Sequence, residues 1–594
     1  MSYRRKKLLA LFCATALSMT AVAGCTGTKS STGNVVSSET EVNAKETVAQ
    51  SETGTFSSAD MFTERDLAGT YEESGAVYVT LSGDGITGET DGVAINGQTV
   101  TITAEGTYIF SGTLSEGQIV VDADKAKVQI VFDNVDITCA SSAAVYVKNA
   151  EKVFVTLAEG AQNTLRNTDE YVAIDDNNID AVIFAKSDLT LNGTGSLTII
   201  SAEGHGIVSK DDLKIIGGTY DIIAAGRALS GKDSVRIADG TFILTAEKDG
   251  IHAENADDEE KGYIYIADGD FTITSDGDGM DASNIVQIED GTLDITAGGG
   301  AANSLKTHES DVPGGPGGGM PQNGEKLDGE SMPQMGEKPD GENMPQDTTT
   351  DESGTSTKGI KAGGGMYLNG GTYQIDSADD SIHSNANITI ADGTYTLATG
   401  DDGVHADDAL IVNGGTITVT ESYEGLEGLA VTINDGTIDI TASDDGINTA
   451  GEKMELNGGY IHILAGGDGV DSNGDLTING GEIYIDGPSD NGNSAIDYGD
   501  RSSAYVNGGT LVAIGSSGMA EVMSDSSKQK VLMVKLGEQM EAGNVVLTDS
   551  EGNVIVSYTA LKTYDCVIIS TAEVESGATY TLTTSGTTTE VTAE

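Results

Sequence analysis

The sequence predicts an all-β protein built mainly as a right-handed parallel β-helix with about 22 residues per coil. The first observation is a two-residue turn that recurs between Met366 and Asp486, at steps of 22, 22, 21, 23 and 22 residues. Such a regular period is typical of a solenoid, in which each repeat contacts only its neighbours. The turns end at Gly371, Gly393, Gly415, Gly436, Gly459 and Gly481.

The second observation is that apolar and polar residues alternate between the turns. A side-chain period of two predicts strands, with the apolar residues facing a core. A leucine-rich repeat has a similar period, but its recurring Leu-x-x-Leu-x-Leu frame is absent. In two successive copies, the residues predicted to face inward are Val404, Leu410, Val412, Ile417 and Val419, and then Leu426, Val431, Ile433, Ile438 and Ile440.

The N-terminal end predicts a lipoprotein signal peptide over residues 1–24. Arg4 to Lys7 are basic, Leu8 to Val22 are mostly apolar, and Val22-Ala23-Gly24-Cys25 resembles a lipobox. The apolar run is short for a membrane span, and small residues follow it, as a cleavage site requires. We therefore expect lipidation of Cys25 and a protein anchored to the extracellular face of the cell membrane. An ordinary signal peptide with an incidental Cys is the alternative.

The charge of the chain narrows the choice of partners. The chain has 31 basic and 94 acidic residues, and removal of residues 1–24 leaves 27 basic residues and a formal net charge of −67. Nucleic acid and anionic membranes repel such a protein, so we expect no nucleic-acid partner and no membrane contact beyond the lipid anchor. A cationic partner or a divalent metal is favoured. Beyond Cys13 and Cys25 the cysteines are Cys139 and Cys566, which lie far apart, so we expect no disulfide framework.

The remaining chain divides by composition. Residues 25–61 are rich in Ser, Thr, Glu and Gly and are predicted to form a disordered tether. Residues 62–140 carry less periodic strands and are predicted to form an N-terminal β cap on the β-helix of residues 141–526. Residues 527–594 have short strands separated by Glu-Gly-Asn and Ser-Gly turns, which predicts a small antiparallel β module at the far end.

One coil is interrupted by an insertion at about residues 304–357. It repeats Met-Pro-Gln at Met320, Met332 and Met344 and has almost no aliphatic residues, so we expect it to be disordered. A methionine strip that binds a soft metal is an alternative to a spacer. The residues on either side, 301–303 and 358–361, are predicted to be two halves of the interrupted coil.

An acidic corner recurs in register with the coil, most often as Asp-Gly followed by an apolar residue. Carboxylates one strand spacing apart, about 4.8 Å, repel one another. Such a ladder favours counter-ions, and hard oxygen ligands suit Ca²⁺. The predicted calcium ligands are Asp249, Asp278, Asp281, Asp380, Asp402, Asp445, Asp468 and Asp471.

Other interpretations of the corners remain open. Asp-Gly is also a common turn, and solvated acids need no metal. His252, His383 and His405 share one position of the coil, and we interpret them as a stacked surface row rather than a zinc site, because no Cys or His-x-Glu frame accompanies them. No nucleophile elbow, zinc-protease helix or phosphate loop is found. The basic residues near the corners, none of which is singled out as a catalytic base, are Lys210, Arg227, Lys232, Lys248, Lys306 and Lys361.

A family resemblance is carried by residues 62–67, 141–148, 206–213 and 231–240, together with the Asp-Gly-Ile/Val corners. From about Phe62 to its end, the chain resembles the calcium-associated β-helix carbohydrate-binding family that is common in clostridial surface proteins. The resemblance implies a coil like that of calcium-dependent pectate lyases, and binding of cellulose-type or pectic, polygalacturonate-like polysaccharides. It does not imply lyase activity. Residues 227–230 and Ser381 depart from the acidic corner.

Three functions are compatible with these observations. The favoured one is a surface-anchored monomer that binds an acidic polysaccharide through Ca²⁺, since metal must bridge an acidic glycan to an acidic protein. The alternatives are a calcium-dependent polysaccharide lyase and a structural surface adhesin. No catalytic residue is assigned, and we expect binding rather than catalysis. The chain has no Trp, so stacking on sugar rings would come from Tyr.

Overall fold

The computed structural model describes residues 56–83, 85–88, 92–306, 356–451, 453–499 and 501–593. The predictions for the signal peptide, Cys25, most of the tether and most of the insertion lie outside these residues. All described residues belong to one compact unit. Its helices are short: η1 (Ser58–Asp60), α1 (Glu64–Leu67) and η2 (Ala301–Asn303). Within the described ranges, no helix is long and apolar enough to cross a membrane.

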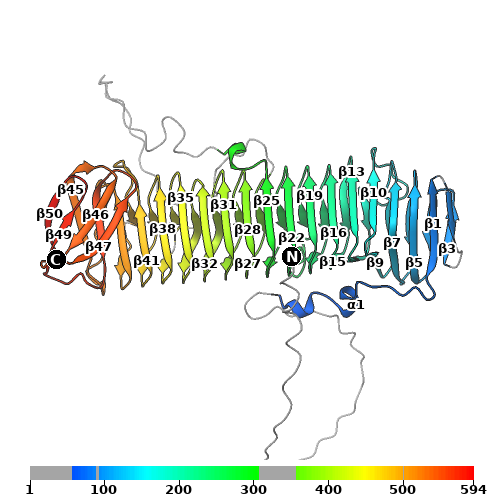
Figure 1. Cartoon of the computed structure of the whole chain (residues 1–594), viewed down its shortest axis with the longest axis horizontal. Coiled ribbons are helices and arrows are strands. Elements are labelled where there is room, and N and C mark those ends of the chain that lie inside the picture. The colour runs from blue at the N-terminus through cyan, green and yellow to red at the C-terminus, as the bar shows by residue number, and fades with distance from the viewer. Residues whose placement is uncertain are drawn as a thin grey trace, which may run out of the picture. The chain divides into compact units, whose positions relative to one another are not determined.

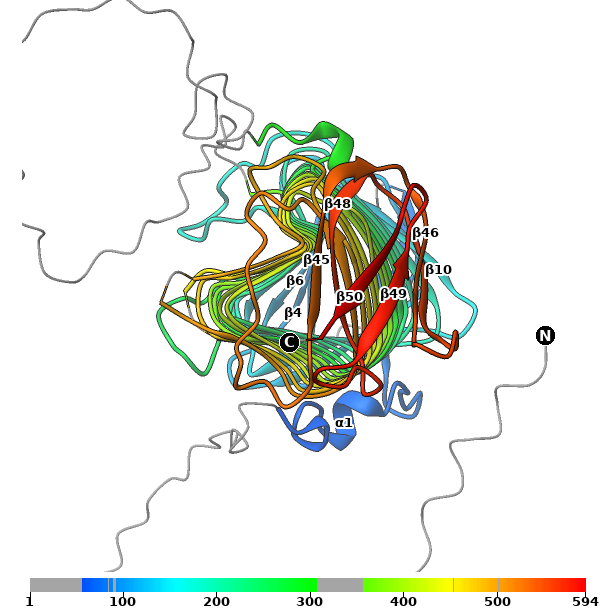
Figure 2. The same ribbon diagram turned by 90° about the vertical axis from the view of Figure 1, so that its left-hand side faces the viewer.

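Strands are the main regular elements of the unit, and most of them lie in three columns of parallel strands. Each coil adds a strand to each column, and this strand pairs in register with the next coil. In Figure 1 the coils follow one another in sequence order, and Figure 2 looks along the coil. An all-β, mostly parallel coil is therefore confirmed, and it has the character of a solenoid.

The first column has the longest strands. In order of pairing it contains β1 (Val77–Gly83), β5 (Gly106–Leu114), β7 (Lys127–Thr138), β10 (Gln162–Asn167), β13 (Ser196–Ser201), β16 (Thr219–Ala224), β19 (Thr241–Ala246), β22 (Asp270–Ser275), β25 (Thr292–Ala297), β28 (Thr372–Ser377), β31 (Thr394–Thr399), β33 (Thr416–Glu421), β35 (Thr437–Ala442), β38 (Tyr460–Ala465), β41 (Glu482–Asp486) and β44 (Thr510–Gly515).

The second column follows the acidic corners. It contains β4 (Thr99–Ile102), β6 (Gln118–Asp122), β8 (Val145–Asn149), β11 (Ala181–Ala185), β14 (His205–Ser209), β17 (Leu229–Gly231), β20 (Ile251–Ala253), β23 (Met280–Ala282), β26 (Ile360–Ala362), β29 (Ile382–Ser384), β32 (Val404–Val412), β34 (Leu426–Ile433), β36 (Ile447–Thr449), β39 (Val470–Ser472) and β42 (Ile496–Tyr498).

The third column closes each coil and shares β7, β32 and β34 with the other two. Its further strands are β9 (Lys152–Leu157), β12 (Asp188–Gly193), β15 (Asp212–Ile215), β18 (Ser234–Ile237), β21 (Tyr263–Ile266), β24 (Val286–Ile288), β27 (Met366–Leu368), β30 (Ile388–Ile390), β37 (Met454–Leu456), β40 (Leu476–Ile478) and β43 (Ala504–Val506).

The core lies inside the coil and is formed by the alternating apolar residues. All ten residues predicted to face inward in the two copies above are at most 1% exposed, which confirms the alternation. Each removes apolar surface from water, so the stacked coils share one continuous core. Register follows from this burial, because a slip by one residue would turn the apolar side chains outward.

Both ends of the coil carry antiparallel strands. At the N-terminal end, β1 already pairs in parallel with β5, within the range predicted as a cap, while β2 (Gly85–Gly88) and β3 (Val93–Asn96) pair antiparallel with β1 and β4. At the C-terminal end, β48 (Tyr564–Ser570) pairs antiparallel with β44 and with β45 (Leu532–Met540). A separate four-stranded sheet contains β46 (Gly543–Thr548), β47 (Val554–Ala560), β49 (Thr579–Thr583) and β50 (Thr588–Thr592).

Residues 56–67 lie against the third column. The Phe56 amide donates to Gln287 Oε1, and the Phe56 ring packs against Tyr263 with ring centroids 4.4 Å apart. Met61 is fully buried. The prediction of a disordered tether up to residue 61 is therefore wrong for residues 56–61, because these two apolar side chains find partners on the coil.

Candidate metal centre

In most coils, the corner that joins a first-column strand to the next second-column strand is built around a glycine, and other residues, such as Ala228, Ser381 and Ala495, take this position in the rest. A Cβ on Gly446 would lie 2.6 Å from the carbonyl oxygen of Gly469, and one on Gly469 would lie 2.6 Å from that of Ala495. At these two glycines the next coil therefore approaches too closely for a side chain. The residue before the glycine can point away, and in most coils it is Asp.

One oxygen of a corner aspartate has a structural role. Asp380 Oδ1 accepts a hydrogen bond from the Asp402 amide at 3.2 Å, and Asp445 Oδ1 accepts one from the Asp468 amide at 2.6 Å. Asp468 Oδ1 accepts the Ser494 amide in the same way. These carboxylates satisfy the backbone of the following coil, as a side chain does in an Asx turn. The other oxygen of each remains for a cation.

A second row of side chains runs beside the corner aspartates, three residues further along each coil. Pairing between adjacent strands stacks these residues directly on one another. Basic and acidic residues are mixed in the first part of the row, and acidic residues replace the basic ones in the last part. In order, the row contains His252, Asp281, Lys361, His383, His405, Glu427, Asn448, Asp471 and Asp497.

The corner acids from Asp249 to Asp402 each lie close to a basic side chain of the protein itself. This pairing offsets the repulsion that a ladder of acids would otherwise suffer. The nitrogen–oxygen distances are 2.8 Å for Arg227–Asp249, 3.5 Å for Lys361–Asp278, 3.6 Å for Lys361–Asp281, 2.5 Å for Lys358–Asp380, 2.7 Å for Lys306–Asp401 and 3.0 Å for His405–Asp402.

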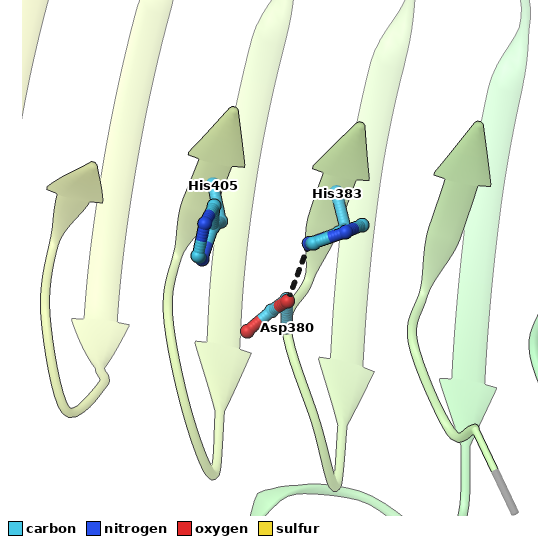
Figure 3. A group of neighbouring side chains, drawn as sticks. All are labelled: Asp380, His383 and His405. Atoms are coloured by element: carbon cyan, nitrogen blue, oxygen red, sulfur yellow. Dashed lines mark ion pairs between the residues drawn. The ribbon is translucent and has the colours of Figure 1, made fainter. Parts of the chain in front are cut away.

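Two of the histidines take part in this pairing. Figure 3 shows His383 and His405 on adjacent strands, with His383 Nδ1 2.8 Å from Asp380 Oδ2. Their ring centroids are 5.0 Å apart and the ring planes are tilted by 57°, so these two histidines are neighbours in one row, as predicted, but their rings are not stacked. The prediction of a surface row is wrong for His252, which is 6% exposed and is separated from the other two by Asp281 and Lys361.

His405 and Asp380 keep their charges in these pairs, whereas burial and the charges of Asp402 and Asp380 raise the pKa of Asp401 to about 9. Burial alone would lower the pKa of His405, but hydrogen bonds to Asp402 and Asp407 outweigh it and raise that pKa to about 12. Burial alone would raise the pKa of Asp380, but the Lys358 ammonium and His383 hold it well below its usual value. His405 therefore acts as a fixed cation between Asp402 and Glu427, whose Oε2 lies 3.1 Å away.

The corner acids nearer the C-terminal end are different. Ligand atoms of Asp445, Asp468 and Asp471 all lie within 4.8 Å of one another. Among the residues that the structure describes, no Lys, Arg or His nitrogen lies within 4.0 Å of these three carboxylates, or of the neighbouring Asp444 and Asp497. This group of three carboxylates is called the open acidic cluster below.

The electrostatic cost of this arrangement is visible in the pKa values. Burial, with the added charges of Asp444 and Asp468, raises the pKa of Asp445 to about 8. Burial also raises the pKa of Asp468 to about 7, although the Ser494 amide opposes the shift. For Asp471, burial and the charge of Asp497 raise the pKa to about 6. A cation bound here would relieve this repulsion.

The structure thus sorts the eight predicted ligands into two groups. It brings Asp445, Asp468 and Asp471 together with no cation from the described part of the chain beside them, and it gives each of the other five a basic neighbour. Asp249 and Asp281 also flank His252, whose Nδ1 lies 3.5 Å and 3.0 Å from them. Asp278 accepts hydrogen bonds from Ser356 Oγ and the Lys358 amide, both at 2.7 Å.

Sequence reasoning missed Asp497 and Lys358. Asp497 stands in an Ala-Ile-Asp corner without the Asp-Gly signal, and only its pairing with Asp471 reveals that it extends the row. Lys358 was assigned to the interrupted coil without a role. Lys361 occupies the second-column position of its coil. The residue three positions earlier, Lys358, therefore occupies the corner.

The fold defines a parallel β coil with a ladder of acidic residues along one edge. A family model described as "carbohydrate-binding domain-containing protein" matches residues 96–403 and 401–553, which is more than half of the chain. The chain therefore belongs to this carbohydrate-binding family.

Two further similarities are narrower. A carbohydrate-binding domain-containing protein from Acetivibrio thermocellus is 44% identical over 176 residues, which cover 29% of this chain and 62% of that protein. The chain thus spans less than two thirds of that relative. A solved structure of a polysaccharide lyase-like protein from C. thermocellum, a gadolinium derivative, is 36% identical, with a TM-score of 0.37 over 38% of this chain and 92% of the other.

Proposed function

We propose that this protein is a cell-surface lipoprotein that binds an acidic, pectic-type polysaccharide through Ca²⁺ held at the open acidic cluster. The observation that carries the proposal is that the two parts of the acidic ladder differ in their pairing with protein cations. The corner acids from Asp249 to Asp402 have protein cations beside them, whereas no Lys, Arg or His of the described ranges pairs with Asp445, Asp468 or Asp471. Membership of a carbohydrate-binding family supports a glycan as the partner.

The donor atoms of the open acidic cluster fit a calcium ion. They are all carboxylate oxygens, and Ca²⁺ prefers six to eight oxygen ligands in a flexible arrangement. Asp445 and Asp468 each use one oxygen on a backbone amide, so with both oxygens of Asp471 the cluster offers fewer than six free oxygens. The remaining positions can be taken by carboxylates of a uronic-acid chain, so the ion would link two partners that otherwise repel each other.

Binding suits this geometry better than β-elimination, the reaction of the alternative lyase. β-Elimination needs a general base, which is a group that is deprotonated near neutral pH and can accept a proton from the substrate. Burial alone would lower the pKa of Lys358, but the charges of Asp380 and Asp379 outweigh it and raise that pKa above its ordinary value. The pKa of Lys361 is raised in the same way by Asp278 and Asp281. Both lysines therefore hold their protons as counter-ions.

The cellular setting of the proposal comes from the N-terminal sequence. Lipidation at Cys25 would hold the protein at the membrane, on the extracellular face, and residues between Cys25 and Phe56 would separate the coil from the lipid surface. In this setting the coil, which we take to be right-handed, presents its acidic edge to polysaccharide outside the cell.

The experiment is retention of the protein on polygalacturonate with Ca²⁺ and with EDTA. The test variant is Asp445→Asn/Asp468→Asn, because the Asn oxygen can still accept the amide hydrogen bonds of the next coil. The control is Asp290→Asn/Asp392→Asn, which removes two charges from turns at the other end of the first-column strands. We expect Ca²⁺-dependent retention of the wild type and the control, and at least a tenfold loss in the test variant.

Two results would contradict the proposal. One is retention that EDTA leaves undiminished, which would exclude bridging by a metal. The other is equal retention of the test and control variants. Rising absorbance of unsaturated products on pectate with Ca²⁺ would instead favour the lyase.

A further inference from the structure

An open furrow runs across four coils at the opposite end of the first-column strands from the open acidic cluster. It lies where β35, β38, β41 and β44 begin, whereas the acidic corners follow the ends of these strands. The rise of a six-residue strand separates the two regions by roughly 20 Å. The floor of the furrow is formed by Gly436, Gly459, Gly481 and Gly509.

The floor is bare backbone for a steric reason. A Cβ on Gly459 would lie 2.6 Å from the carbonyl oxygen of Gly436, and one on Gly481 would lie 2.7 Å from that of Gly459. These glycines also have positive φ angles, 85° at Gly459 and 89° at Gly481, which other residues rarely adopt. Because the stacked coils approach each other this closely, the floor of the furrow has no side chains.

Tyr460 forms a wall of this furrow and is 42% exposed. Strand pairing places it between Thr437 and Glu482, in a row that has Thr in most other coils. The ring of Tyr460 lies 5.7 Å from that of Tyr484, which stacks at 5.2 Å on Tyr558 of β47. The neighbouring rings limit the freedom of Tyr460, so its exposed face is partly fixed before any ligand arrives.

A row of amide side chains leads into the floor. Asn434, Asn457, Asn479 and Asn507 each stand two positions before a floor glycine, and each Nδ2 donates to Oδ1 of the preceding Asn at 2.8 to 2.9 Å. Each Asn amide has a second N–H and a second lone pair, which can bind hydroxyl groups. The amides beside the furrow are thus held in a regular order along the coil.

The charge of the furrow limits its occupant. Among its described lining residues, the charged groups are the carboxylates of Asp435 and Glu482, and there is no Lys or Arg. These carboxylates can accept hydrogen bonds from sugar hydroxyls but repel a uronic-acid chain. An aromatic face between polar groups suits a pyranose ring, which has an apolar face of C–H groups and a rim of hydroxyls.

We propose that this furrow is a second carbohydrate site, which binds a neutral polysaccharide without metal. The chain would lie across the coils on the glycine floor, with one sugar ring against Tyr460 and hydroxyl groups bound by Asp435, Glu482 and the asparagine row. The proposal that the furrow binds carbohydrate rests on membership of the carbohydrate-binding family, and it does not depend on the calcium site. One molecule could therefore hold an acidic and a neutral glycan at the same time.

The test is calorimetric titration of the full protein in EDTA with a panel of neutral polysaccharides and with cellohexaose. We expect binding by the wild type and a five- to tenfold loss of affinity in Tyr460→Ala, since an exposed aromatic anchor carries much of such a contact. Tyr460→Phe keeps the ring face and should stay within about twofold of the wild type. The control is Tyr78→Ala, which removes another exposed tyrosine, 47% exposed, from β1.

The outcomes separate this site from the calcium site. The Asp445→Asn/Asp468→Asn variant should bind neutral glycan normally while losing polygalacturonate. The inference is overturned if the wild type binds no neutral glycan, if EDTA abolishes that binding, or if folded Tyr460→Ala binds as tightly as the wild type. None of these results bears on retention of polygalacturonate with Ca²⁺.

Discussion

At the scale of single residues, Lys358 shows how the ladder is neutralised. Its ammonium lies 2.8 Å from Asp379 and 2.5 Å from Asp380, and its side chain is 12% exposed. Burying a charge is costly unless a partner of opposite sign is close by. Lys358 and the two aspartates therefore stabilise the coil only as a group.

We predict that Lys358→Met destabilises the protein by about 3 kcal/mol, because it leaves Asp380 buried without its main partner. The matched control is Lys127→Met, whose side chain is 45% exposed in its pair with Glu151. Exposed pairs contribute about 0–1 kcal/mol, so the control should stay near the wild type. Denaturant unfolding measures both variants, and equal stability of the two would contradict this account.

The sequence could predict the acids of the ladder but not their cations. The aspartates recur beside Gly at a fixed period, so their positions follow from the repeat alone. Lys306, Lys358 and Lys361 flank a long insertion, and in the sequence they look like ordinary solubilising lysines. Their role depends on which coil each one joins, and that follows only from pairing such as Asp281 with Lys361.

At the scale of elements, residues 56–67 join the start of the described chain to the third column. Thr63 caps α1, and Asp66, which is fully buried, binds Lys152 Nζ at 2.6 Å and Thr190 Oγ1 at 2.8 Å. Burial alone would raise the pKa of Asp66, but the bonds to Lys152 and Thr63 lower it to about 2. The stability gained is present above pH 3.8 and is lost as the pH falls toward 2.

We predict that Asp66→Ala releases this segment, because Lys152 is then left in a largely buried position without its partner. Hydrogen exchange of residues 56–67 should rise by at least tenfold. Glu64→Ala, an exposed change in the same short helix, should leave the exchange unchanged. Unchanged protection in Asp66→Ala would show that the other contacts of the segment, such as those of Phe56 and Met61, hold it without Asp66.

Some elements follow from local sequence patterns, whereas others depend on contacts between residues that are far apart in the sequence. Alternation and turn glycines predicted the parallel coil, since each coil repeats the same local pattern. The ordered segment 56–61 was missed because its two anchors, Phe56 and Met61, stand among polar residues and find partners more than 100 residues away. No local pattern carries such a contact.

At the scale of the whole molecule, the account depends on how charge is distributed along the coil. A chain with 94 acidic and 31 basic residues cannot pair every acid. Here the paired acids lie toward the middle of the coil, and the open acidic cluster lies nearer the C-terminal end. The open acidic cluster is therefore a place where carboxylates without a nearby protein cation, among the described residues, lie close enough together for a divalent ion to bind.

The pH dependence of this cluster follows from its raised pKa values. Asp445, Asp468 and Asp471 have pKa values of about 8, 7 and 6 when folded, against an ordinary value of 3.8. The folded state therefore binds more protons than the unfolded state between pH 3.8 and 8. Without metal, these groups lower stability as the pH rises through that range. Ca²⁺ must displace the same protons, so its affinity should rise from pH 5 to pH 8.

The most direct test of the account is calorimetric titration of metal-free protein with Ca²⁺ at pH 8 and at pH 5. The account predicts binding at pH 8 that is at least tenfold weaker at pH 5, is lost in Asp445→Asn/Asp468→Asn, and is retained in Asp290→Asn/Asp392→Asn. Binding of Ca²⁺ that is as tight in the Asp445→Asn/Asp468→Asn variant as in the wild type, or the absence of binding at pH 8, would contradict it.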